Sequence, residues 1–310
     1  MKILITGALG HIGSYVLERA NEFNLIDKIY IIDNFSSERY STLFNISIKK
    51  KKLIFIKKDL SEKDSLRKIP KVDIVLHLAA LTNAAASIKI RKLIYKNNFG
   101  MFGNIVDYCI KNNSKLIHVS STSVYGKQNG LVDESCKFLK PQTPYAEIKL
   151  LEEKLLQKNK KKINFLTLRF ATIAGVSAGM RFHTAVNKFC LDAILGDVIY
   201  VWRGVFKQYR PYLSLSDAFA VIKFIINQNY FDRKIYNVLT SNYTVKDIIG
   251  IIKKYKSKVK IRFVKSQIIN QFSYKVSDKK IRRMQILKNN SIVQDIKQTL
   301  ELFSNINSKS

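Results

Sequence analysis

Tyr145 and Lys149 are the residues whose types and spacing point most directly to chemistry. They lie four positions apart in a stretch with helical periodicity that begins near Pro144, so they would face the same side of a helix, one turn apart. A tyrosine hydroxyl releases its proton near pH 10 in water and can act as a base at neutral pH when a cation lies beside it. Lys149 is placed to be that cation. The same spacing is common in surface pairs, so other residues must support this interpretation.

A cluster of hydroxyl side chains, Ser120 to Ser123, follows the predicted strand Leu116 to Val119. A hydroxyl at the carboxyl end of a strand can hydrogen-bond the substrate oxygen that gains or loses a proton. Serine and threonine clusters are also common in turns. Together with Tyr145, Lys149 and a dinucleotide motif, this cluster predicts a catalytic site.

Gly7, Gly10 and Gly13 form a GxxGxxG motif directly after the first predicted strand and before an amphipathic helix. In that context one glycine allows a tight turn, one lets the backbone approach a pyrophosphate, and one lets helix and strand pack closely. His11 and Ile12 lie inside the motif and are predicted cofactor contacts. The alternative is an ordinary glycine-rich turn.

Asp33 ends the second predicted strand, where a carboxylate can accept hydrogen bonds from the adenosine ribose and repel a 2′-phosphate. The first arginine after it is Arg39. The sequence therefore predicts NAD as the cofactor over NADP, with Asn34 beside Asp33, although an aspartate here could also be a turn residue. Asp59 and Leu60 follow the third strand and are predicted to cap the adenine.

The first half of the chain alternates short β-branched runs with longer periodic segments, which is typical of parallel strands joined by crossover helices. The pattern predicts an α/β fold, a doubly wound, Rossmann-type parallel sheet whose ligand crevice lies at the carboxyl ends of the strands. The predicted strands are Lys2 to Thr6, Lys28 to Ile32, Leu53 to Ile56, Ile74 to Leu78, Leu116 to Val119 and Phe165 to Leu168.

After Arg169 the rhythm becomes irregular, as expected where loops wrap a ligand. Ser214 to Gln228 and Lys234 to Val238 resemble a helix and a strand that return to the main sheet. We therefore predict two lobes that are discontinuous in sequence: an NAD-binding domain of residues 1–170 with about 212–240, and a smaller substrate-binding lobe of about 171–211 with 241–310.

Composition excludes several classes of protein. At 310 residues and 46% hydrophobic content, the chain can bury a large core and is not a disordered tail protein. The three cysteines, Cys109, Cys136 and Cys190, have no zinc or disulfide spacing and are expected to be buried and reduced. No histidine pair has metal-ligand spacing, so no metal is predicted. With no signal-peptide pattern and no apolar stretch near the roughly 20 residues of a membrane helix, we expect a cytoplasmic protein without a membrane partner.

The formal net charge is +31, a field that could attract nucleic acid, anionic membranes or phosphorylated substrates. Runs such as 158–162 and 253–260 could form a nucleic-acid footprint. The lysines are, however, dispersed and rarely interleaved with the aromatic residues or arginines that contact bases. We favour solvated surface lysines and expect no nucleic-acid partner.

With these motifs combined, the chain resembles the extended short-chain dehydrogenase/reductases, the family of sugar-nucleotide epimerases and dehydratases, over nearly its whole length. The resemblance rests on the glycine loop and on these further segments: Asp33-Asn34, His77 to Ala80, Asn97, Ser120 to Gly126, Pro144 to Lys149, Leu168 to Phe170, Gln208 to Tyr212, Val276 to Asp278 and Lys280-Ile281.

The resemblance implies roles for individual residues. Ser121, four residues before Tyr125, takes the position of the catalytic Ser/Thr; Tyr145 would take a proton from a sugar hydroxyl while the carbon gives hydride to NAD, and Lys149 would hold the nicotinamide ribose. Paired-helix homodimers are usual in the family. Further cofactor contacts implied are Leu78, Ala79, Ala80, Asn97, Ser120, Tyr145 and Lys149. Substrate contacts implied are Ser121, Thr122, Thr172, Arg181, Asn187 and Arg210, with Arg210 as a diphosphate ligand; the last three could instead have surface or packing roles.

Departures from the family pattern narrow the activity. Dehydratases of this family carry Asp-Glu where this chain has Thr122 and Ser123, and the related decarboxylases carry Glu at Ser123. The predicted function is therefore an NAD-dependent sugar-nucleotide epimerase, acting at C4 through a 4-keto intermediate. The alternatives are a keto-sugar-nucleotide reductase or dehydrogenase, a 4,6-dehydratase and a non-catalytic RNA-binding relative. Thr172 stands where many epimerases have Asn, and Lys265 stands near the place of a late phosphate-binding Arg, so the nucleotide base stays open.

Overall fold

Short strands rich in Ile, Leu and Val form a seven-stranded parallel sheet in the order β11-β7-β5-β4-β1-β2-β3. The computed structural model describes residues 1–44, 46, 48, 51–82, 90–265, 273–288 and 291–304. The strands are β1 (Lys2–Thr6), β2 (Lys28–Asp33), β3 (Lys52–Lys57), β4 (Ile74–His77), β5 (Lys115–Ser121), β7 (Phe165–Phe170) and β11 (Ile235–Val238). The predicted doubly wound α/β fold is confirmed, because the chain runs outward from β1 to β3 and then returns to β4 on the other side of β1.

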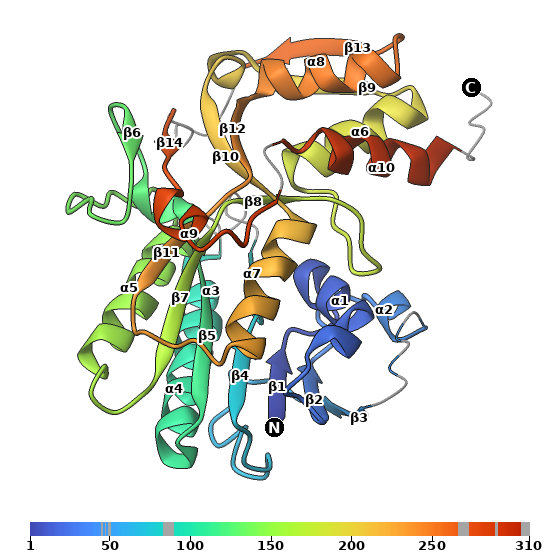
Figure 1. Cartoon of the computed structure of the whole chain (residues 1–310). Helices are drawn as coiled ribbons and strands as arrows, with labels where there is room; N and C mark the ends of the chain where they lie inside the picture. Colours follow the sequence, from blue (N-terminus) through green and yellow to red (C-terminus); the bar gives the residue numbers. More distant parts are fainter. Residues whose placement is uncertain are drawn as a thin grey trace.

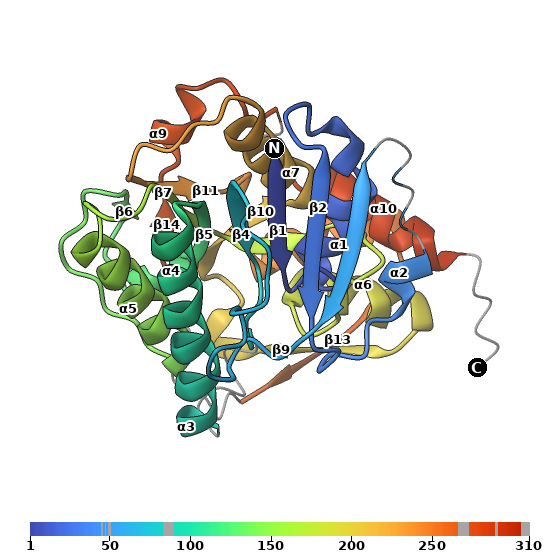
Figure 2. The ribbon, with the colours of Figure 1, turned by 90° about the horizontal axis from the view of Figure 1, so that it is seen from below.

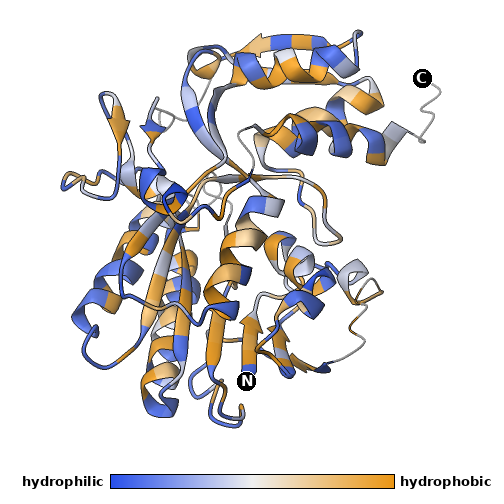
Figure 3. Ribbon diagram, in the orientation of Figure 1, coloured by the Kyte–Doolittle hydropathy of each residue, from blue (hydrophilic) through white to orange (hydrophobic). Residues whose placement is uncertain are grey.

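Helices cover both faces of this sheet (Figures 1 and 2). On one face α1 (His11–Glu18) and α7 (Leu215–Asn227) share a buried apolar core with the strands. On the other face α4 (Met101–Asn112) and α5 (Pro144–Lys158) form a second core. The strands are buried on both faces, which explains their nearly continuous hydrophobic runs. In Figure 3 the strands are accordingly mostly orange, whereas blue residues lie on the outer sides of the helices.

Shorter helical elements connect the main ones. These are α2 (Ser41–Phe44), the 3-10 turn η1 (Ala20–Glu22), α3 (Arg91–Ile94), the π-helical turn η3 (Tyr95–Gly100) and the 3-10 turn η4 (Thr122–Tyr125). The π turn lies between α3 and α4, and such turns are frequent at functional sites. It carries Asn97, one of the predicted cofactor contacts.

A second layer lies above the carboxyl ends of the strands (Figure 1). Its strands are β8 (Thr172–Ala174), β10 (Tyr209–Ser214) and β12 (Ser241–Thr244) in one sheet, β9 (Val198–Trp202) with β13 (Lys260–Val264) in another, and β6 (Leu131–Val132) with β14 (Lys275–Val276). Its helices are α6 (Ala185–Leu195), η5 (Arg203–Val205), α8 (Val245–Tyr255), α9 (Lys279–Arg282) and α10 (Val293–Ser304). Helices α6, α8 and α10 share a third buried core. The exact lobe boundaries stay a prediction.

Two compositional expectations can be compared with the structure. Cys109 and Cys190 are buried, but Cys136 is partly exposed, so the expectation of burial is wrong for Cys136; it lies in the loop after β6. Across the described residues, no helix combines the length and the apolar character needed to span a bilayer.

Candidate active site

A cavity of about 780 Å³ lies at the carboxyl ends of the parallel strands. It extends to both sides of the neighbouring strands β1 and β4, at the place where the order of the strands reverses. The wall of this cavity is formed by residues at the end of each central strand or just after it. The second layer contributes Arg181, Gln208, Arg210 and Tyr274. Every predicted site residue lines this cavity except Asn187, which is fully buried and donates through Nδ2 to the carbonyl of Arg181 (3.0 Å).

The glycine loop packs so closely against neighbouring backbone that no side chain would fit at Gly7 or Gly13. Gly7 has a φ of +63°, and a Cβ there would lie 2.6 Å from the backbone of Ala79; a Cβ on Gly13 would lie 2.5 Å from the carbonyl oxygen of Ala8. Gly10 lines the cavity at the start of α1. A loop this close to the backbone, followed by a helix N-terminus, fits the pyrophosphate of a dinucleotide such as NAD.

Asp33 lies at the end of β2 and holds this loop. Its carboxylate accepts from the backbone N–H of Leu9 (3.2 Å) and of Phe35 (3.0 Å). Asp59 accepts from the side-chain amide of Asn34 (3.1 Å), and all four predicted adenosine contacts, Leu60 included, line the cavity. Hydroxyls of an adenosine ribose at this part of the cavity would meet carboxylate acceptors.

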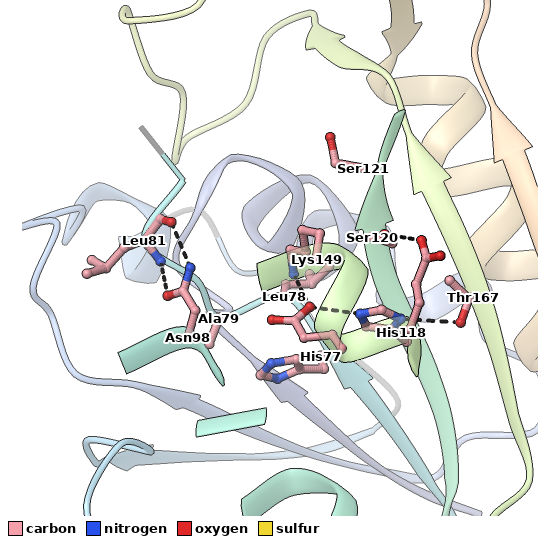
Figure 4. A network of polar contacts seen from close by, with 12 residues as sticks. His77, Leu78, Ala79, Leu81, Asn98, His118, Ser120, Ser121, Lys149 and Thr167 are labelled. Carbon is pink, nitrogen blue, oxygen red and sulfur yellow. Dashed lines mark hydrogen bonds and ion pairs between the residues drawn. The ribbon is translucent and has the colours of Figure 1, made fainter. Parts of the chain in front are cut away.

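Asn97 and its neighbour Asn98 differ in their surroundings, because the side chain of Asn98 is buried and bonded to the backbone. Asn97 lines the cavity within the π turn. Asn98 is buried and makes two hydrogen bonds of 2.9 Å with the backbone of Leu81, as Figure 4 shows. This pair of bonds fixes the segment after β4, where Leu78 to Ala80 also line the cavity.

Tyr145 and Lys149 lie on one side of α5, next to the cavity. Thr143 caps this helix by accepting from the N–H of Ala146 (3.2 Å), and Pro144 occupies its first turn. The Lys149 Nζ lies 5.9 Å from the centre of the Tyr145 ring. The predicted tyrosine and cation are therefore neighbours in space, and both line the cavity.

Lys149 is buried, and its ammonium forms an ion pair of 2.8 Å with Glu152. Burial by itself lowers the pKa of Lys149, but the carboxylate of Glu152, together with Tyr145 and Glu153, outweighs that effect, so the pKa lies above its ordinary value. His118 on β5 shares the same Glu152 oxygen at 2.9 Å.

Ser120 and Ser121 point in opposite directions because successive side chains of a strand alternate. Ser121 Oγ accepts from the N–H and the hydroxyl of Ser123 (3.2 and 2.9 Å) and points away from the buried network of Figure 4. Ser120 donates instead to Glu153 (2.6 Å), which also pairs with Arg169. The hydroxyl of Ser120 is therefore already engaged within the protein, although the residue borders the cavity.

Basic side chains line the part of the cavity that the second layer covers. Arg181 donates to the hydroxyl of Thr82, and its Nε has no partner among the described residues. Arg210 on β10 lies 5.1 Å from the ring centre of Tyr274. Burial lowers the pKa of His183 to about 4, so this residue is neutral near pH 7. Two arginines facing one cavity fit a diphosphate.

A family model describes most of this chain. It is that of the "NAD dependent epimerase/dehydratase family", and it matches residues 3–238. The chain belongs to this family. Its membership confirms the resemblance seen in the sequence and, through the name of the family, the NAD cofactor.

Relatives in the family carry several epimerase names. An uncharacterized UDP-glucose epimerase of Bacillus subtilis is 28% identical over 254 residues, covering 77% of this chain and 76% of that protein. An ADP-L-glycero-D-manno-heptose-6-epimerase of Brachyspira hyodysenteriae is 26% identical over 250 residues, covering 77% and 76%. The structure of UDP-glucuronic acid 4-epimerase from Bacillus cereus, in complex with UDP-glucuronic acid and NAD, superimposes with a TM-score of 0.88 at 23% identity, covering 99% of this chain and all of that one. This last likeness shows the fold.

Several residues of this family member were not singled out in the sequence. Arg39, Thr82 and His183 line the cavity, and Glu152 and His118 lie behind Lys149. The charge of Arg39 was visible in the sequence, but its place on the cavity wall depends on how the segment after β2 folds back. Among the described residues, no group of three or more His, Cys, Asp or Glu side chains is arranged to hold a metal ion.

Proposed function

We propose that this chain is an NAD-dependent epimerase that inverts C4 of a sugar nucleotide through a transient 4-keto sugar. The observation that carries the proposal is that Tyr145, Lys149 and Ser121 line the same cavity as the glycine loop and Asp33. The cavity volume of about 780 Å³ lies within the usual range of small-molecule and cofactor sites.

In this proposal Tyr145 accepts a proton from the C4 hydroxyl and later returns it. Ser121 would hydrogen-bond the same oxygen, since its hydroxyl faces the cavity and can donate. Lys149 stays protonated, because Glu152 raises its pKa.

NAD would be held by the glycine loop at its pyrophosphate, by Asp33 and Asn34 at the adenosine ribose, by Asp59 and Leu60 at the adenine, and by Lys149 at the nicotinamide ribose. Leu78 to Ala80, Asn97 and the backbone around Ser120 would border it. When bound, NAD takes up a hydride from the sugar carbon and gives it back, so the reaction consumes no net cofactor.

The distribution of acids in the cavity favours epimerisation over dehydration. Among the described residues that line it, the carboxylates are Asp33 and Asp59, both at the adenosine wall. Thr122 and Ser123 stand beside Ser121, where elimination of water would need an acid to protonate the departing hydroxyl. Simple oxidation followed by re-reduction needs no such group.

We propose a nucleoside diphosphate sugar as the substrate, with Arg181 and Arg210 at the diphosphate. Thr122 and Thr172 would lie near the sugar and the nucleotide. The names of relatives and of structural neighbours include epimerases for UDP-glucose and UDP-glucuronic acid. These two compounds are the first to test, and the homodimer implied by the family resemblance stays a prediction.

The test uses sugar nucleotides deuterated at C4, each incubated with the purified chain. The proposal expects a product epimeric at C4 that keeps its label, with no NADH required in proportion to product. Tyr145→Phe is the control that should form none. Loss of NADH absorbance in step with product would indicate a reductase, and loss of the mass of water would indicate a dehydratase. Either outcome would overturn C4 epimerisation.

A further inference from the structure

A chain of buried polar contacts runs from the active-site lysine into the protein. Lys149 Nζ and His118 Nε2 contact the same oxygen of Glu152, at 2.8 and 2.9 Å, and His118 Nδ1 lies 3.2 Å from the hydroxyl of Thr167. Figure 4 shows this chain as dashed lines between α5, β5 and β7. Lys149, Glu152 and His118 are at most 3% exposed. Such contacts are not screened by water, so they are strong and sensitive to substitution.

The partners fix the protonation of His118. Burial lowers its pKa, against the opposing effect of Glu152, so the ring is neutral near pH 7. A neutral imidazole has one N–H, and the carboxylate of Glu152 can only accept, so Nε2 donates to Glu152 and the hydroxyl of Thr167 donates to Nδ1. The buried charges are then one ammonium and one carboxylate, held in a fixed geometry.

Other titratable groups face this chain. His77 on β4 is fully buried, and burial lowers its pKa to about 3, so it is neutral. Glu153 is the next residue on α5, but it pairs with Arg169 (2.7 Å) and accepts from Ser120 (2.6 Å). Tyr145 lies on the cavity side of Lys149. Glu152 is therefore the carboxylate in direct contact with the lysine, and Glu153 balances a different cation.

We propose that Glu152 and His118 are positioning residues that keep Lys149 charged and aimed at the cavity, and thereby set the upper pH limit of the enzyme. This inference rests on the proposed function, in which Lys149 holds the nicotinamide ribose and acts on Tyr145. An ammonium has three N–H donors, so the bond to Glu152 leaves donors for a ligand. Without Glu152, Lys149 would lose the strongest of the interactions that oppose the effect of burial, so it would lose its proton at lower pH.

The paired residues on α5 provide a matched control. Glu152→Gln removes the charge that touches Lys149, whereas Glu153→Gln removes an equally buried charge that touches Arg169. Both changes keep the size of the side chain. A merely structural role for Glu152 would make the two variants behave alike.

The first measurement is the dissociation constant of NADH, followed by its fluorescence from pH 6.5 to 9.5, which needs no sugar substrate. For Glu152→Gln we expect affinity to fall about tenfold over this range as Lys149 loses its proton, the change that one pKa unit produces. The wild-type chain and Glu153→Gln should change far less. If Glu152→Gln followed the wild-type curve, the proposal would be overturned.

Two substitutions of His118 serve if Glu152→Gln does not fold. His118→Gln keeps an N–H that can donate to Glu152 and should restore the wild-type pH dependence, while His118→Phe should shift it toward lower pH. Equal behaviour of the two variants would overturn the role of His118.

The second measurement is kcat/KM against pH with a sugar nucleotide that is turned over. Its alkaline limb should move to lower pH in Glu152→Gln and stay in place in Glu153→Gln. Failure to find any sugar nucleotide substrate would count against the proposed function, whereas the NADH titration would still decide the role of Glu152. If Glu152→Gln still turned over the substrate and its alkaline limb did not move, the role proposed for Glu152 would be overturned, while the proposed function would stand.

Discussion

Gly179 lies so close to Leu9 that a Cβ added to it would stand 2.3 Å from the Leu9 carbonyl oxygen. The same segment of chain makes further bonds to the glycine loop: Gly179 N–H donates to Ser14 Oγ, and Ser177 Oγ donates to the carbonyl of His11, both at 2.9 Å. Residues 175–181, which follow β8, therefore hold the loop from above. The loop's shape depends on a contact made more than 160 residues away in sequence.

Gly179→Ala should consequently weaken NADH binding. The methyl group would press on backbone atoms of Leu9 and Gly10, which cannot move aside without displacing the loop, and we expect a loss of about tenfold or more in affinity together with lower stability. Gly250→Ala on α8 is the control, because its Cβ would meet nothing within 4 Å. NADH titration and thermal unfolding of both variants measure the difference. Unchanged affinity in Gly179→Ala would show that the loop does not need this contact.

The chain should bind NAD more tightly than NADP, because the Asp33 carboxylate would repel a 2′-phosphate. Arg39 lies on the same wall and would reduce this preference without reversing it. Dissociation constants for both cofactors test the prediction. Asp33→Asn should bring the two constants closer together, and Arg39→Ala should separate them further. Tighter binding of NADP by the wild-type chain would remove Asp33 from the ribose site.

The parts of the structure that were predictable from the sequence are those specified locally. The strands followed from β-branched runs, and the relation of Tyr145 to Lys149 followed from their spacing on one helix. The contact of His118 with Glu152 was not predictable, because it joins residues 34 apart on different elements. The bond that His11 Nε2 donates to the carbonyl of Gly175 joins residues 164 apart. Which long-range partners meet depends on how the layers pack, and the sequence pattern alone does not contain that information.

Tyr145 and Lys149, which both line the cavity from α5, should respond differently to substitution. Tyr145→Phe should lower turnover by about 10² to 10⁴-fold, the usual contribution of a general base, while NADH still binds, because the lost hydroxyl serves proton transfer. Lys149→Ala should impair both turnover and NADH binding. Steady-state rates and NADH fluorescence separate the two effects. A Tyr145→Phe enzyme that kept most of its activity would show that another group is the base.

Asp295 on α10 provides a prediction about stability. It is 7% exposed, and Ser214 Oγ donates to it at 2.7 Å, which joins α10 to β10. Burial is the main cause that raises its pKa to about 7, and the nearby charge of Asp217 adds to it. The folded protein thus favours the protonated carboxyl. Ionisation of Asp295 opposes folding, and this penalty grows as the pH rises from the ordinary pKa of 3.8 to about 7.

Asp295→Asn should therefore stabilise the protein above pH 7 and change its stability little near pH 4. The amide oxygen can still accept from Ser214, and the uncharged side chain avoids a penalty on the order of 4 kcal/mol at pH 8. Thermal unfolding at pH 4, 6 and 8 measures the effect, which should appear as a Tm difference that grows with pH. Asp107→Asn, at an exposed position on α4, is the control and should show no such trend. If Asp295→Asn lowered Tm equally at all three pH values, the carboxylate of Asp295 would instead be a partner that the fold requires in its charged form.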